Sequence, residues 1–184
     1  MSCIQTESGV AFDLLRPRAE DVHLEDIAHS LSLQCRWTGH CKSHFSVAQH
    51  SVLVAGLVPE GLVGWALMHD AAEAYIGDIS TPWKRELQTL EGEPVSSVES
   101  RILAAIAEAL GLSPGGVPAE VKEADWRVLK AERRDLLRYW VRWELDDNAD
   151  FCAVTAAPGK IVPWDMGTAE GMFLYEWQQW RVRQ

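Results

Sequence analysis

A histidine–aspartate pair embedded in an apolar segment constrains the fold of this chain more than any other feature. The pair is His69-Asp70, and it follows the apolar run Trp65-Ala66-Leu67-Met68. The surrounding pattern predicts a helix from Leu62 to Ile76 that ends at Gly77. Two neighbouring polar groups on a buried helix cost several kcal/mol unless something compensates them. Imidazole nitrogen and carboxylate oxygen are ordinary ligands of divalent transition metals, so a bound cation is one way to compensate the pair.

The dipeptide alone is weak evidence, because a core histidine beside a solvent-facing aspartate is a common arrangement. Three other residues favour a metal site. His50 lies on the preceding predicted helix, with apolar residues one turn away on either side. Glu73 follows Asp70 by three residues and therefore projects from the same helix face. Asp125 lies on a later helix among apolar neighbours, so three helices offer an imidazole or carboxylate toward one interior point.

Most of the remaining chain has helical periodicity. A turn at Glu7-Ser8-Gly9 predicts a short β-hairpin between residues 3–6 and 10–15. Two further helices are expected to begin near Glu25 and after a Ser46 cap, and a third runs from Thr81-Pro82 through Leu87. A fourth follows a Ser96-x-x-Glu99 capping box and ends at Gly111, and a fifth runs from Pro118 to about Tyr139. The last begins at Thr168, with Met172, Tyr175 and Trp177 or Trp180 on its apolar face. Residues 146–163 look irregular.

These patterns predict an all-α fold with a short N-terminal β-hairpin, organised as a single domain over residues 1–184. Within it we expect a hairpin and lead-in over residues 1–24, a metal-binding helical core over 25–140, and a C-terminal extension over 141–184. The nine tryptophans are expected in the core or at a self-association surface, which leaves a homo-oligomer, a dimer or higher, open.

Charge and cysteine usage exclude several classes of protein. A net charge of −10 argues against a dedicated nucleic-acid binder, which needs a basic surface. The four cysteines form no CxxC motif, and the N-terminus does not resemble a signal peptide. No apolar run approaches the roughly 18–20 residues that cross a bilayer. We therefore expect a cytoplasmic protein with free thiols and no membrane partner.

The order His50, His69-Asp70, Asp125 resembles that of the HD-domain phosphohydrolase superfamily. Residues 69–84 resemble the 5′-deoxynucleotidase branch in particular, whose pattern is HDxxE, then GD, then TPxK. Arg36-Trp37, fourteen residues before His50, residues 46–51, and residues 123–125 match further segments of that branch. The resemblance spans roughly residues 25 to 130 and extends to the phage-type dATP triphosphohydrolases. It implies an HD-domain helical bundle.

Matched position by position, the resemblance implies a centre for one metal ion with four ligands, which are His50, His69, Asp70 and Asp125. It also implies that Glu73 orients or deprotonates the attacking water. The expected cofactor is one divalent ion of cobalt, manganese, zinc or iron, with magnesium as a further candidate. The extra histidines of the cyclic-dinucleotide phosphodiesterases have no counterpart in the pattern, which agrees with a single metal ion.

The same resemblance implies four substrate contacts. Arg36 would clamp a phosphate, for which its planar fork of donors is suited. Trp37 would pack against the sugar, and Asp78 would accept a hydrogen bond from the 3′-hydroxyl. Lys84 would lie near the phosphate end of the pocket. The expected partner is therefore a small nucleotide substrate.

Three functions remain open at this point. The first is release of 5′-phosphate from deoxynucleoside monophosphates, and the second is release of triphosphate from a dNTP such as dATP. Additional basic or histidine side chains around the phosphate, for which His40, Lys42, His44 and Lys84 are candidates, would favour the second. The third is a non-catalytic nucleotide-sensing protein of the same fold, against which the intact Glu73 counts.

Overall fold

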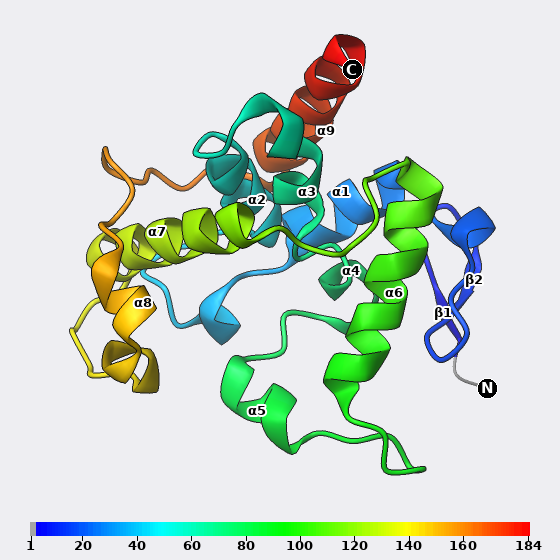
Figure 1. The fold of residues 1–184 in the computed structure, drawn as a ribbon, viewed down its shortest axis with the longest axis horizontal. Helices are drawn as coiled ribbons and strands as arrows, with labels where there is room; N and C mark the ends of the chain where they lie inside the picture. Colours follow the sequence, from blue (N-terminus) through cyan, green and yellow to red (C-terminus); the bar gives the residue numbers. More distant parts are fainter. Residues whose placement is uncertain (1–2) are drawn as a thin grey trace.

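The computed structural model describes residues 3–184, so the first two residues of the expected lead-in lie outside the described residues. The chain is mostly helical, with a short two-stranded antiparallel sheet at its N-terminus (Figure 1). In this hairpin β1 (Cys3–Gln5) pairs with β2 (Ala11–Asp13), which confirms the prediction. The α-helices are α1 Leu24–Leu33, α2 Val47–Ala55, α3 Val63–Met68, α4 Glu73–Ile76, α5 Thr81–Glu86, α6 Val95–Leu110, α7 Ala119–Leu136, α8 Ala149–Ala153 and α9 Met166–Arg183.

Helix α2 lies at the centre of the bundle and contacts α1, α3, α7 and α9. It is buried on nearly every side because its residues are apolar or small almost all round. The Ser46 side chain accepts a hydrogen bond from the Gln49 amide, so the predicted cap is confirmed. This placement buries the imidazole of His50 completely.

The prediction of one continuous helix from Leu62 to Ile76 is wrong, because the structure has two helices in this segment. Helix α3 ends at Met68 and α4 begins at Glu73, with a turn between them. In that turn the Nδ1 of His69 binds the Ala66 carbonyl oxygen (2.7 Å), the acceptor that a regular helix offers to the Asp70 amide. The expected end at Gly77 is confirmed, and the φ of +84° there is one that glycine adopts without strain.

The predicted capping box at Ser96-x-x-Glu99 is also wrong. Helix α6 begins at Val95, so Ser96 lies inside its first turn, and Pro94 occupies the cap position. The Glu99 carboxylate instead accepts a hydrogen bond from Lys84 Nζ at 2.6 Å. A charged partner on a neighbouring element therefore replaces the expected backbone amide.

The C-terminal part differs from expectation in four ways. Helix α7 ends at Leu136, before Tyr139, and α8 forms within the segment expected to be irregular. Helix α9 begins at Met166, because Asp165 rather than Thr168 caps it. Its buried residues are Ala169, Phe173, Trp177 and Trp180. Tyr175, expected on the apolar face, is exposed because it lies on the opposite side of the helix from Phe173.

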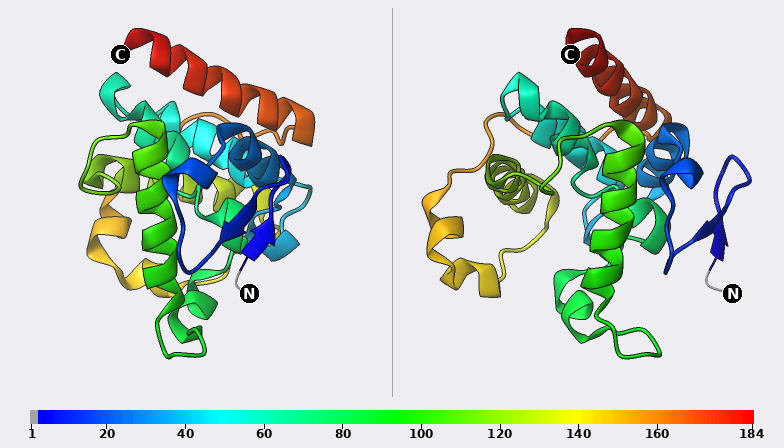
Figure 2. Two further views of the ribbon diagram at one scale, coloured as in Figure 1. Left: turned by 90° about the vertical axis from the view of Figure 1, so that its right-hand side faces the viewer. Right: turned by 45° about the vertical axis from the view of Figure 1, so that its right-hand side comes forward.

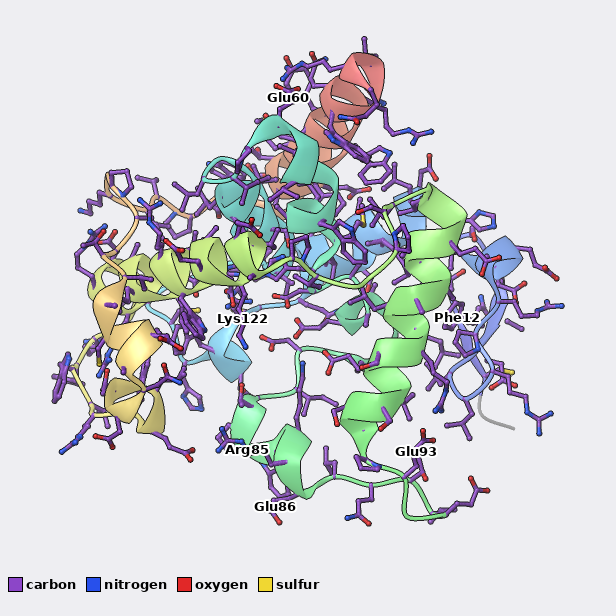
Figure 3. The ribbon with its side chains drawn as sticks, viewed as in Figure 1. Phe12, Glu60, Arg85, Glu86, Glu93 and Lys122 are labelled. Atoms are coloured by element: carbon purple, nitrogen blue, oxygen red, sulfur yellow. The ribbon has the colours of Figure 1, made fainter. Side chains whose placement is uncertain are left out.

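Helix α9 closes the core. Figure 2 shows it across the top of the molecule, and it contacts α1, α2 and α3. Trp180 packs directly on Gly64 of α3, where a Cβ would come within 2.4 Å of the indole ring. Near the end of α9, Arg183 pairs with Glu60, which is labelled in Figure 3. The buried residues of α9 belong to the same apolar cluster as those of α1, α2 and α3.

Within residues 3–184, no helix combines the length and the apolar character that a bilayer crossing requires.

Two of the contacts that attach the N-terminal hairpin to the helical bundle involve Phe12 and Ser8. Phe12 of β2 stacks on Tyr75 of α4, with 3.8 Å between ring centroids. The buried carboxylate of Asp26 on α1 accepts hydrogen bonds from the Ser8 amide and the Ser8 hydroxyl, each at 2.7 Å. Burial acts to raise the pKa of Asp26, but hydrogen bonds from Ser8 and Thr6 hold this pKa below its usual range.

We predict that Asp26→Ala lowers the free energy of unfolding by about 1–3 kcal/mol at pH 7, since it leaves both Ser8 donors without their acceptor. Ser8→Ala removes only the hydroxyl bond and should cost less. Because the folded-state pKa of Asp26 is depressed, the ionised carboxylate stabilises the folded protein at neutral pH. This contribution is lost as the pH falls through that pKa. Urea unfolding from pH 7 to pH 3 measures this, and equal stabilities of the wild type and Asp26→Ala at pH 7 would contradict it.

Candidate metal centre

The structure brings His50, His69, Asp70 and Asp125 together from three parts of the chain. His50 projects from α2, Asp125 from α7, and the adjacent pair from the turn after α3. The Nε2 atom of His50 lies 3.2 Å from His69 Nε2 and 3.1 Å from Asp125 Oδ1. One Asp70 oxygen lies 3.4 Å from His69 Nε2 and 3.7 Å from His50 Nε2. The ligand atoms of His50, His69 and Asp125 lie within 4.8 Å of one another, so this group could hold a metal ion.

The hydrogen bonds behind the two imidazoles favour a cation between them. His50 Nδ1 lies 2.5 Å from a Glu132 oxygen, and His69 Nδ1 lies 2.7 Å from the Ala66 carbonyl oxygen. With acceptors only at these positions, each Nδ1 carries a proton, which leaves each Nε2 as the nitrogen that can bind a further proton or a metal ion. Facing lone pairs repel unless a proton or metal ion lies between them. Two imidazole nitrogens with carboxylate oxygens fit a divalent transition metal.

The surrounding charges agree with this interpretation. Burial and the charge of Arg36 act to lower the pKa of His50, but Glu132 and Asp125 raise it to about 9. At neutral pH a proton on His50 is therefore favourable, and any bound cation displaces it. Burial opposes ionisation of Asp70, yet the nearby His69 and His50 hold the pKa of Asp70 well below its usual range. The site thus keeps an ionised carboxylate ready for a cation.

A cleft of about 690 Å³ opens beside this group. Its lining residues come in part from α5, from α7 and from the segment before α8. Figure 1 shows the positions of these elements. Of the residues singled out in the sequence, those that line the cleft are Arg36, Trp37, Asp70, Glu73, Asp78, Lys84 and Asp125. Arg85, labelled in Figure 3, joins α5 to the opposite wall through an ion pair with Glu144. Pockets of this size are typical of small-molecule sites.

Glu73 lines the cleft beside the candidate metal-ligand group, which consists of His50, His69, Asp70 and Asp125. Only 4% of Glu73 is exposed. Its Oε1 accepts a hydrogen bond from Lys84 Nζ at 3.2 Å. Its Oε2 is buried and has no hydrogen-bond partner among the residues that the structure describes. Burial raises the pKa of Glu73 well above its ordinary value, and the charges of Asp70 and Asp78 add to this shift. Such a carboxyl group is suited to exchange protons.

Asp78 is placed by a hydrogen-bond bridge from Gln34, the residue that follows α1. The Gln34 side chain accepts from the Asp78 amide and donates to the Glu73 carbonyl oxygen, each at 2.9 Å. Burial raises the pKa of the Asp78 carboxyl group, while Arg36 opposes this change. The Asp78 side chain is therefore held at the cleft wall near Glu73.

Sequence reasoning missed Glu132, although this side chain is fully buried behind the candidate site. Besides His50, it accepts hydrogen bonds from Arg36 Nε at 3.2 Å and from Trp37 Nε1 at 3.0 Å. Glu132 follows Asp125 by seven residues, or two helical turns, and therefore shares its helix face. That spacing was the available signal.

Trp143 was expected only as a core or dimer contact, but it lines the cleft. Its ring lies 5.1 Å from that of Trp37, tilted by 35°, and the Arg133 guanidinium stacks 3.8 Å from its centroid. Trp143 therefore covers one face of Trp37, the residue expected to pack against a sugar.

The four residues that would indicate a longer phosphate chain are not gathered at the cleft. Within residues 3–184 only Lys84 of this group lines it. Lys42 Nζ donates to the Asp135 carbonyl oxygen, and His40 is exposed to solvent. His44 is half-buried away from the cleft lining.

Comparison with known proteins identifies relatives of this chain. No family model matches it. It is 40% identical over 178 residues to the uncharacterized protein YfdR of Escherichia coli. This aligned region covers 95% of this chain and 93% of that protein. The chain belongs to the YfdR family. It is also 38% identical over 126 residues to an uncharacterized protein of Rhodobacter capsulatus, which covers 64% of this chain and 62% of that protein.

We predict that Asp125→Asn weakens manganese or cobalt binding at least about tenfold, since even a residue one shell beyond a metal affects affinity by about 10–100-fold. The matched control is His40→Gln, which alters an exposed histidine outside the cleft lining. Equilibrium dialysis followed by elemental analysis measures both variants. Metal binding by Asp125→Asn equal to that of the wild type would remove Asp125 from the ligand set.

Proposed function

We propose that this chain is a metal-dependent phosphohydrolase of the HD type that acts on deoxynucleotides. The observation that carries the proposal is the buried Oε2 of Glu73, which has no partner among the described residues and lies at the cleft beside the metal-ligand group. An unpaired carboxylate oxygen in the interior is costly. A water molecule held for attack on phosphorus would satisfy it.

In this proposal His50, His69, Asp70 and Asp125 hold one divalent ion of cobalt, manganese, zinc, iron or magnesium. Such an ion supplies Lewis acidity, which activates water and polarises a phosphoryl oxygen. The two carboxylates keep the site anionic, and the two imidazoles present Nε2 toward it. Two imidazoles with two carboxylates differ from the closed thiolate-rich sets of structural zinc, which favours a catalytic role.

The protein's own side chains supply the remaining steps. Lys84 holds Oε1 of Glu73, so Oε2 is oriented to take a proton from water. Arg36, which donates from Nη1 to Asp70 at 3.2 Å, is placed to bind phosphate oxygens and to offset their charge. Asp78 offers a carboxylate to a sugar 3′-hydroxyl, while Trp37 contributes apolar surface.

The distribution of cations favours a monophosphate over a triphosphate substrate. A triphosphate carries more charge and requires more basic contacts than one phosphate group. The cleft offers Arg36, Lys84 and Arg85, and each of these already pairs with a carboxylate. His40, Lys42 and His44 do not line it. Release of 5′-phosphate is therefore the better-supported reaction, with dNTP triphosphohydrolysis as the alternative.

A non-catalytic nucleotide sensor is the alternative of another class. It requires the same cleft but has no use for a nearly buried acid with one unpaired oxygen. Turnover distinguishes the two directly.

We predict that the protein releases inorganic phosphate from deoxynucleoside monophosphates when manganese or cobalt is supplied. Ribo- and deoxynucleoside mono-, di- and triphosphates would be tested with each metal. Ion chromatography separates phosphate from tripolyphosphate, so tripolyphosphate as the main product would favour the alternative reaction. An absence of turnover with every nucleotide would leave the sensor hypothesis in its place.

We predict that Glu73→Gln lowers kcat by about 10²–10⁴-fold, because the amide cannot accept the proton. Its metal content should remain near that of the wild type, since Glu73 is not a proposed ligand. Glu86→Gln on the exposed surface of α5, labelled in Figure 3, is the matched control and should keep full activity. Full activity of Glu73→Gln would exclude the water-handling role.

A further inference from the structure

Resting on the proposed function, we infer that Glu132 is a positioning residue that fixes the metal centre and the phosphate-binding arginine through one buried carboxylate. Glu132 lies on α7 with none of its surface exposed. It does not line the cleft, so it acts only through other side chains.

The two oxygens of Glu132 serve different parts of the site. Oε1 accepts from His50 Nδ1 at 2.5 Å. Oε2 accepts from Arg36 Nε at 3.2 Å and from Trp37 Nε1 at 3.0 Å. One carboxylate thereby joins a candidate metal ligand on α2 to two candidate substrate contacts that follow α1.

The bond to His50 determines which nitrogen faces the metal site. Because Nδ1 donates to Glu132, Nε2 is the nitrogen left to bind a metal ion, and it points toward His69 and Asp125. Without this acceptor, the ring is free to adopt the other tautomer or to rotate. Metal affinity therefore depends on Glu132, although Glu132 is not itself a ligand.

The bonds to Arg36 and Trp37 hold a segment whose backbone is otherwise unfavourable. Trp37 and Thr38 have φ values of 62° and 51°, a conformation that residues other than glycine seldom adopt. Such backbone persists only where tertiary contacts over-determine it. With Nε fixed by Glu132, the Nη1 of Arg36 reaches Asp70 at the cleft. Glu132 therefore also sets the position of the phosphate clamp.

The test substitutes Glu132 by Gln, which keeps the size of the side chain but replaces one acceptor oxygen with a donor amide. The amide oxygen can accept hydrogen bonds either from His50 or from Arg36 and Trp37, but not from both sides. We expect manganese affinity to fall by about 10–100-fold, as for other residues that orient metal ligands. We also expect binding of inorganic phosphate to the manganese-loaded protein to weaken at least tenfold, and KM for a deoxynucleoside monophosphate to rise more than kcat falls.

Manganese binding followed by electron paramagnetic resonance and phosphate binding followed by tryptophan fluorescence do not require turnover. A failure of the proposed hydrolase activity is therefore distinguishable from a failure of this inference. Glu120→Gln, on the exposed surface of the same helix, is the control and should match the wild type.

Glu132→Asp serves if the Gln variant does not fold. It keeps the charge but withdraws the carboxylate by one methylene. We expect it to weaken manganese and phosphate binding, but less than Glu132→Gln does. Urea unfolding verifies that each variant is folded before binding is measured. A folded variant that binds manganese and phosphate as tightly as the wild type would overturn the inference, because a merely structural glutamate affects stability alone.

Discussion

The hydrogen bond between His50 and Glu132 is the interaction on which the rest of the structure depends. Both side chains are fully buried, at the contact of α2 with α7. An ionised carboxylate in the interior is tolerated only when donors surround it. Glu132 has three, from His50, Arg36 and Trp37. Burial acts to raise the pKa of Glu132, but Arg36 and His50 hold this pKa below its usual range. The chain before α2 must therefore pass directly over α7, and this brings Arg36 to the cleft.

The remaining helices exclude water from this polar cluster. Helix α9 packs on α1, α2 and α3, and Trp180 lies against Gly64. The Gln49 side chain, next to His50, accepts from the Trp164 amide and donates to the Val162 carbonyl oxygen, each at 2.9 Å. The segment that returns from α8 to α9 is thereby fixed to α2. Because apolar packing covers one side and polar contacts the other, the cleft is the approach to the candidate metal-ligand group.

Features that depend on local sequence were predictable, and features that depend on distant contacts were not. The hairpin, the Ser46 cap and the glycine end at Gly77 follow from residues within a few positions of one another. The capping box failed because Lys84, from another helix, binds Glu99. The helix around His69 is interrupted because its ring binds the Ala66 carbonyl oxygen, which its periodicity does not show. Glu132 and Trp143 contact the site through residues far apart in the sequence, so apart from the spacing of Glu132 from Asp125 no local pattern marks them.

The charge balance of the cleft explains why a resemblance in sequence could suggest substrate contacts without selecting the substrate. Arg36 pairs with Asp70 and Glu132, and Lys84 pairs with Glu73 and Glu99. Under the proposed function, a phosphate group would therefore displace carboxylates from these two cations. It would not meet an excess of positive charge, and the net charge of −10 also argues against such an excess. Each further phosphate would need another cation to offset its charge. This balance is set by ion pairs between residues far apart in the sequence, which the order of motifs along the chain does not reveal. Within the proposed function, it favours a substrate with one phosphate group.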